Sequence, residues 1–195
     1  IPIEGNSSET VDVTCGEGYK DTEVFNETSN YNSSVGSGVF IGHQGGAYDD
    51  TDTAKWWYSH QANKGEYLSY GPYKPLPAGN YECGLELGIN DISAGSPGDT
   101  IAVIDAYGGG GSGLIAEKVI TRDMFQVAIV GSTAPPGSLV DFRVPFTWDN
   151  NGTVECRVKT KIAPPDVTAL VHTRTRIVRI GGGDTVVSDC AAGER

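Results

Sequence analysis

The sequence predicts an all-β fold, a single antiparallel β-sandwich of about nine or ten strands preceded by an N-terminal arm. Apolar and polar residues alternate with a period of two in segment after segment, which is typical of strands with one buried face. The chain has 27 glycines and 10 prolines, which suit many short turns. No long segment shows the periodicity of an amphipathic helix. We expect residues 1–15 to form the arm and residues 16–195 the sandwich.

The stretch Gly65–Leu87 is the clearest guide to the fold. It begins with an alternating segment, continues through three prolines that cannot donate to a strand ladder, and ends in a second alternating segment. In that second segment Tyr81, Cys83, Leu85 and Leu87 fall at every second position, so we expect them on one buried face. Leu76, and with it Tyr73, is predicted to plug the edge of the sandwich between the two strands.

The remaining elements follow from alternation, from apolar runs at 38–42 and 100–106, and from turn-like composition. Residues 16–37 are predicted to be either a surface loop or an edge strand around Glu23–Phe25, residues 43–53 a loop, and residues 121–125 one helical turn capped by Thr121. In the last strand, Thr173, Thr175, Ile177 and Arg179 are expected on one face and His172, Arg174, Arg176, Val178 and Ile180 on the other. The other predicted strands are 11–14 in the arm, 38–42, 54–60, 66–70, 100–106, 114–120, 139–147, 153–162 and 172–180.

Composition excludes several classes of function. The formal net charge is -11, so the phosphates of nucleic acid and anionic membrane surfaces would be repelled. No run approaches the roughly 20 apolar residues of a membrane helix, so we expect no membrane insertion. At 38% hydrophobic residues the chain can bury a core.

The cysteines and glycosylation sequons favour a secreted or cell-surface protein. Four cysteines allow three pairings, of which we favour Cys83–Cys156 across the core and Cys15–Cys190 between arm and tail. The alternative is a cytosolic protein with buried free thiols. Four Asn-x-Ser/Thr sequons, predicted glycosylation sites, occur at Asn6, Asn26, Asn32 and Asn151.

From Trp57 to about Ile180 the chain resembles the galactose-binding-like jelly rolls, a class that includes the family 6 and family 35 carbohydrate-binding modules. The resemblance rests on Tyr70-Gly-Pro-Tyr73 with Leu76-Pro-Ala-Gly-Asn-Tyr81, on Ile104-Asp-Ala-Tyr107 with the glycine hairpin after it, and on Leu114–Val119, Asp123–Phe125, Phe142 and Thr153–Val158. It implies a jelly-roll sandwich and a non-catalytic sugar-binding module, often with a structural calcium ion. Domains of this fold also serve in adhesion and assembly.

Sugar binding needs aromatic rings that stack on pyranose faces, with polar side chains nearby for the hydroxyls. Trp56, Trp57 and Tyr58, followed by Glu66, are the first candidates for such a site, and at least one of the tryptophans is expected in the core. Tyr48 and Tyr107 are further candidates.

Asp49, Asp50 and Asp52 place three carboxylates in one predicted loop and are a candidate calcium site, since calcium prefers carboxylate and carbonyl oxygens. A solvated acidic turn is the favoured interpretation, because three carboxylates fill only part of the calcium shell. The scattered histidines have no zinc-ligand spacing, and no motif assigns a nucleophile, acid or base, so we expect no enzyme.

Two functions are compatible with these features. The first is an extracellular carbohydrate-binding module with glycans as partners. The second is a glycosylated subunit of a surface filament, pilus or sheath, a homo-oligomer whose arm adds as a strand to the sheet edge of the next copy.

Overall fold

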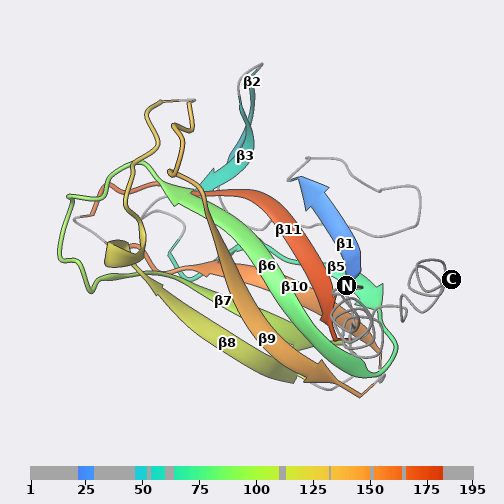
Figure 1. The fold of residues 1–195 in the computed structure, drawn as a ribbon. Coiled ribbons are helices and arrows are strands. Elements are labelled where there is room, and N and C mark those ends of the chain that lie inside the picture. The colour runs from blue at the N-terminus through green and yellow to red at the C-terminus, as the bar shows by residue number, and fades with distance from the viewer. Residues whose placement is uncertain are drawn as a thin grey trace, which may run out of the picture.

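The chain folds as an antiparallel β-sandwich of the jelly-roll type, as expected (Figure 1). The computed structural model describes residues 22–28, 47–51, 54–59, 64–109, 113–131, 133–149, 152–163 and 166–181; in the first three ranges it describes the backbone only. The expected arm, the strand at 38–42, the Cys15–Cys190 pair and the sequons Asn6, Asn32 and Asn151 lie outside these ranges and stay predictions. The addition of the arm as a strand to another copy also stays a prediction.

One sheet has six strands in the order β2-β3-β11-β6-β9, with β1 also paired to β11. All its pairings are antiparallel, and β1 and β3 share one edge of β11 because they pair with different parts of that strand. The bounds are β1 Thr22–Thr28, β2 Ala47–Thr51, β3 Ala54–Ser59, β6 Gly79–Ile89, β9 Val140–Trp148 and β11 Leu170–Ile180.

The second sheet has five strands in the order β4-β10-β7-β8, with β5 also paired to β10. Its strands are β4 Tyr67–Ser69, β5 Pro72–Pro75, β7 Thr100–Gly108, β8 Gly113–Thr121 and β10 Thr153–Thr160, and one 3-10 turn, η2 (Arg122–Met124), follows β8. No helix in the described part of the chain has the length and apolar character to cross a membrane.

The core lies between the two sheets. Tyr81, Cys83, Leu85 and Leu87 of β6 are fully buried, which confirms the alternation predicted for that strand. Facing residues of the other sheet are equally buried: Ile104 and Ala106 of β7, and Val154, Cys156 and Val158 of β10. A disulfide joins Cys83 to Cys156, as predicted, with an S–S distance of 1.95 Å, and so crosslinks the two sheets through the core.

Leu76 is the predicted plug, buried to 3% exposure below the indole of Trp148, whose Nε1–H donates to the Leu76 carbonyl at 3.1 Å. Tyr73 was expected to share this role, and that expectation is wrong. Tyr73 is 40% exposed, because the chain around it pairs with β10 as β5 and does not form a free turn.

Other local expectations need correction. Ala47–Thr51 is strand β2, paired with β3, and not a loop, because three aromatic residues lie opposite it across the hairpin and aromatic residues favour strands, which outweighs its turn-like composition. Residues 16–37 were predicted to be either a surface loop or an edge strand around Glu23–Phe25, and the structure has the edge strand, β1, paired with β11. Thr121 makes no capping bond to η2; its hydroxyl donates instead to the carboxylate of Asp123.

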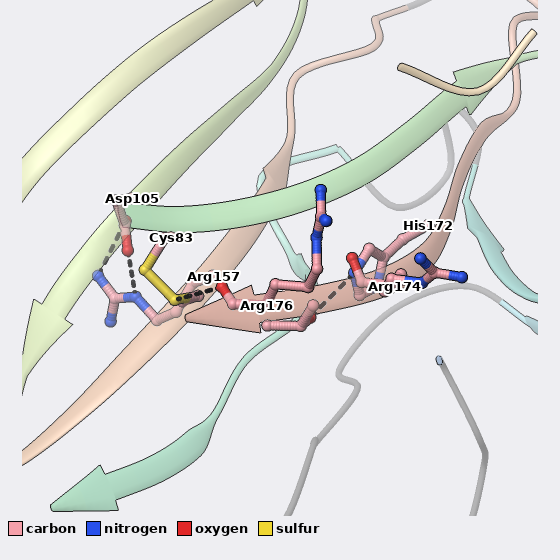
Figure 2. Close-up of a disulfide and its surroundings, with 8 residues drawn as sticks. Cys83, Asp105, Arg157, His172, Arg174 and Arg176 are labelled. Atoms are coloured by element: carbon pink, nitrogen blue, oxygen red, sulfur yellow. Dashed lines mark hydrogen bonds and ion pairs between the residues drawn. A yellow bond between two sulfur atoms is a disulfide. The ribbon is translucent and has the colours of Figure 1, made fainter. Parts of the chain in front are cut away.

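The predicted faces of the last strand are also wrong at its start. The pairing of β11 with β6 shifts between His172 and Arg174, so Thr173 is an extra residue opposite β6. This bulge brings the fully buried imidazole of His172 within 3.1 Å of the Thr175 hydroxyl, although a regular strand would separate the two. Figure 2 shows His172 with Arg174 and Arg176 along the same strand.

Candidate functional site

The outer side of the five-stranded sheet carries a cluster of tyrosines and charged side chains. Alternate residues of β10 point inward as Val154, Cys156 and Val158, so Glu155, Arg157 and Lys159 fall on the opposite, outer side. The register with β7 places Arg157 opposite Asp105, and Glu155 opposite Tyr107. We call this surface the Arg157 face; it comprises Tyr67, Tyr73, Asp105, Tyr107, Glu155 and Arg157.

Arg157 is the centre of the face. Its Nε and Nη2 donate to the two carboxylate oxygens of Asp105 at 2.7 and 3.0 Å, a bidentate ion pair that Figure 2 shows. Its guanidinium carbon lies 3.7 Å from the ring centroid of Tyr107 and 4.7 Å from that of Tyr67. Burial alone would lower the pKa of Arg157, but the hydrogen bonds and charge of Asp105 outweigh it and raise that pKa.

Glu155 is the second buried charge of the face, with an exposed fraction of 8%. Burial raises the pKa of this carboxyl group, although the positive charge of Arg157 and a hydrogen bond with Tyr73 act in the opposite direction. A carboxyl group held in this way can accept hydrogen bonds from a bound molecule and also exchange a proton nearer neutrality than an ordinary glutamate.

Tyr73 is the most exposed aromatic ring of the face. Its φ angle is 58°, in the left-handed region that bulky side chains rarely adopt. Its pKa is raised by burial and by the nearby charge of Glu155. Its ring meets Tyr70 edge-on, with centroids 6.4 Å apart. Strained backbone of this kind clusters at binding and catalytic sites, and so draws attention to Tyr73.

This arrangement can recognise a hydroxyl-rich ligand. Tyrosine rings offer apolar faces to the C–H groups of a sugar, while carboxylates accept from its hydroxyls and Arg157 and Lys159 are donors. Lys159 lies at the rim, its Nζ 5.5 Å from the Tyr67 centroid.

The residues predicted for sugar binding fall mostly elsewhere. Trp56, Trp57 and Tyr58 are in β3 of the other sheet, and the β2–β3 register sets Tyr48 opposite Trp57 and Asp49 opposite Trp56. Glu66 directly precedes β4, beside Tyr67, and is exposed. Tyr107 is the one predicted aromatic residue that lies on the Arg157 face. Sugar binding by the other four aromatic residues, Tyr48, Trp56, Trp57 and Tyr58, stays a prediction.

The calcium hypothesis also stays a prediction. Asp49 and Asp50 lie in strand β2, so the loop conformation that suggested a calcium site is absent from Ala47–Thr51, and Asp52 is outside the described ranges. Among the residues described with side chains, no group of three or more His, Cys, Asp or Glu converges as metal ligands would.

The sequence contains a signal for the Arg157 face that was not used. In β10, charged residues recur at every second position opposite an apolar face, so Glu155, Arg157 and Lys159 were identifiable as one outward row. Asp105 and Tyr73 were not identifiable, because their positions depend on pairings between strands far apart in the chain.

Solved structures that are similar to this chain include the following two. One is the N-terminal CBM22-1 and GH10 modules of Clostridium thermocellum endo-1,4-beta-D-xylanase 10B, complexed with xylohexaose, with 12% sequence identity and a TM-score of 0.46. The similarity covers 85% of this chain and 30% of that chain. The other is the carbohydrate-binding module CBM6cm-2 from Cellvibrio mixtus lichenase 5A in complex with cellotriose, with 12% identity, a TM-score of 0.37, and coverage of 84% of this chain and 92% of that chain.

Both structures contain carbohydrate-binding modules, the class of domain that the sequence resembles. No protein-family model and no curated protein matches the chain. At these identities and TM-scores the two likenesses assign neither a family nor a ligand.

Proposed function

We propose that this chain binds carbohydrate chains on the Arg157 face, as a non-catalytic module outside the cell. The observation that carries the proposal is the combination of three tyrosines with two buried carboxylates and one partly buried guanidinium on the outer side of a sheet. Buried charges away from a binding site are costly, and a purely structural sheet face would not need such a cluster.

The flatness of a sheet face supports binding to the interior of an extended chain. Tyr67 and Tyr107 lie on opposite sides of the Arg157 guanidinium on strands β4 and β7, so aromatic rings recur across the sheet. An oligosaccharide crossing these strands could contact several rings and charged groups in succession. A location outside the cell is supported by the Cys83–Cys156 disulfide, since such bonds persist in oxidising compartments.

The proposal is tested on a glycan array, followed by calorimetry with the best oligosaccharide, in the presence of calcium and again with a chelator. Tyr73→Ala is expected to weaken binding about tenfold, since one ring–sugar contact contributes on the order of 1 kcal/mol. Trp56→Ala and Trp57→Ala test the alternative site on β3. Val130→Ala, an exposed apolar residue in the loop after η2, is the matched control and should bind as the parent does.

No binding to any glycan under either condition would end the proposal. Loss of binding in the tryptophan variants with full binding in Tyr73→Ala would move the site to β3. A requirement for calcium would return attention to Asp49, Asp50 and Asp52.

A further inference from the structure

Tyr73 is the most exposed ring of the surface that we propose for glycan binding, and its conformation has to be imposed by its surroundings. It is 40% exposed, and its φ angle of 58° is one that a bulky side chain adopts only where its neighbours require it. Backbone pairing fixes the chain just before it, since the Cys156 N–H donates to the Gly71 carbonyl at 2.6 Å and Pro72 lies opposite Glu155. These contacts hold the backbone but leave the ring free to rotate about its side-chain bonds.

Glu155 contacts the polar end of this ring. Its carboxylate accepts a hydrogen bond from the Tyr73 hydroxyl. Only 8% of Glu155 is exposed, so it offers little surface of its own to a ligand, whereas it can fix a ring that does reach solvent. The ring also meets Tyr70 edge-on, with centroids 6.4 Å apart. A hydrogen bond at the hydroxyl and an aromatic contact therefore hold the ring together.

Charged and titratable groups face Glu155 from three strands. On its own strand, β10, the positive charge of Arg157 attracts the carboxylate. On β7, Asp105 repels it and Tyr107 lies opposite it in the register. On β5, Tyr73 donates to it, and this bond favours the ionised form. The strength of the bond to Tyr73 therefore depends on the charge of Glu155.

Protonation of Glu155 weakens the hold on the ring, because a hydrogen bond to an ionised carboxylate is roughly twice as strong as one between neutral groups. Burial raises the pKa of Glu155 above its ordinary value of 4.5, so the proton is taken up at a higher pH than by an exposed glutamate. The strong bond is present above this raised pKa and is lost as the pH falls through it.

We propose that Glu155 is a positioning residue that fixes the Tyr73 ring for glycan binding, and that protonation of Glu155 releases the ring and weakens binding as the solution becomes acidic. This inference rests on the proposed function of the Arg157 face, because it assigns a role to one residue of that site. Arg157 is fixed by a separate set of contacts, to both carboxylate oxygens of Asp105 and to two tyrosine rings. The release therefore acts on Tyr73 and leaves the rest of the face in place.

The hydrogen bond is tested in the protein without ligand. NMR of the full chain with ¹³C-labelled glutamate carboxyl groups follows the titration of Glu155, whose signal is identified by its loss in Glu155→Gln. Tyr73→Phe keeps the ring and removes the donor, so it should raise the pKa of Glu155 further, since a bond that favours the ionised form is gone. Equal pKa values in the parent and in Tyr73→Phe would overturn the inference, whether or not any glycan binds.

Glycan affinity is the second measurement, made by calorimetry with the best oligosaccharide from the array at a series of pH values from neutral downward. The parent should lose affinity about fivefold as Glu155 is protonated, which corresponds to the difference between a charged and a neutral hydrogen bond. Glu155→Gln and Tyr73→Phe should each bind about fivefold more weakly at neutral pH and should lack this pH dependence.

Glu86→Gln is the matched control. Glu86 also accepts from a hydroxyl, that of Thr173 at 2.6 Å, but it lies on the other sheet, so its variant should keep the affinity and the pH profile of the parent. Circular dichroism at each pH verifies the fold. An affinity of the parent that does not change with pH, or a Glu155→Gln variant with the pH profile of the parent, contradicts the inference. If no glycan binds, the proposed function fails, and the titration without ligand still decides whether Glu155 holds Tyr73.

Discussion

At the scale of single residues, two buried titratable groups give the protein opposite responses to acid. Burial lowers the pKa of His172 from its ordinary value of 6.5 to about 4, while burial raises the pKa of Glu155 above its ordinary value of 4.5. Below pH 6.5 the unfolded chain protonates the histidine and the folded protein does not, so stability is lost as the pH falls toward 4. The folded protein holds the Glu155 proton more tightly, so that group favours folding as the pH falls through its raised pKa.

The histidine effect is large enough to measure. From the shift of its pKa, His172 should remove about 3 kcal/mol of unfolding free energy between pH 6.5 and pH 4. In His172→Gln this dependence should disappear, so the free energy of unfolding, measured in guanidinium chloride at a series of pH values, should change less with pH than in the parent. Parallel pH curves for the two proteins would show that His172 is not the group responsible.

At the scale of elements, two backbone carbonyls in the connection between β5 and β6 accept hydrogen bonds that hold this connection against the sandwich. Leu76 fills the edge of the core while its carbonyl accepts from Trp148, and one residue later the carbonyl of Pro77 accepts from the Tyr81 hydroxyl at 2.8 Å. The connection therefore closes that edge of the sandwich with both an apolar side chain and two hydrogen bonds.

Truncation of the plug tests its contribution. Leu76→Ala should lower the free energy of unfolding by about 3 kcal/mol, as expected for a buried leucine whose cavity cannot collapse. Ile92→Ala, which removes an exposed side chain of similar size from the β6–β7 loop, should cost less than about 0.5 kcal/mol. Urea unfolding of both variants decides, and equal losses would mean that Leu76 does not act as a plug.

The elements also show what local sequence can and cannot predict. Alternating or continuous apolar residues between turn residues predicted β6, β7, β8, β9 and β10, and each of these strands contributes buried side chains to the core. Alternation failed at the start of β11, where the extra residue Thr173 reverses the faces, since a bulge is set by the partner strand and leaves no period in the sequence. It failed at β2 because pairing with β3 outweighed composition.

The same limit applies to the candidate site. Arg157 and Asp105 are separated by 52 positions and meet only through the register of β10 on β7. The sequence directed attention to tryptophans, which are prominent in any chain. The charged residues of β10 cannot be recognised as part of a binding surface until the residues on the neighbouring strands are known.

At the scale of the whole molecule, the Cys83–Cys156 bond is a covalent link between the two sheets. It could be predicted because both cysteines fall on inward positions of core strands. The bond spans 73 positions in sequence, so it removes many conformations from the unfolded chain.

Removal of this link should destabilise the entire sandwich. The chain-entropy relation gives about 4 kcal/mol for a loop of this length. The double variant Cys83→Ala/Cys156→Ala is expected to lose about that much in guanidinium unfolding, with the transition still in a single step. A midpoint equal to that of the parent would show that the crosslink contributes nothing to stability.

The Arg157 face has a further consequence for the thermodynamics of binding. The guanidinium lies between two rings and is bonded to Asp105 through two nitrogens, so its long side chain has already lost most of its rotational freedom before any ligand arrives. Ordering one such side chain on association ordinarily costs about 0.5–1.5 kcal/mol. On this surface that entropy is lost when the chain folds, and the ligand meets donors that are already in place.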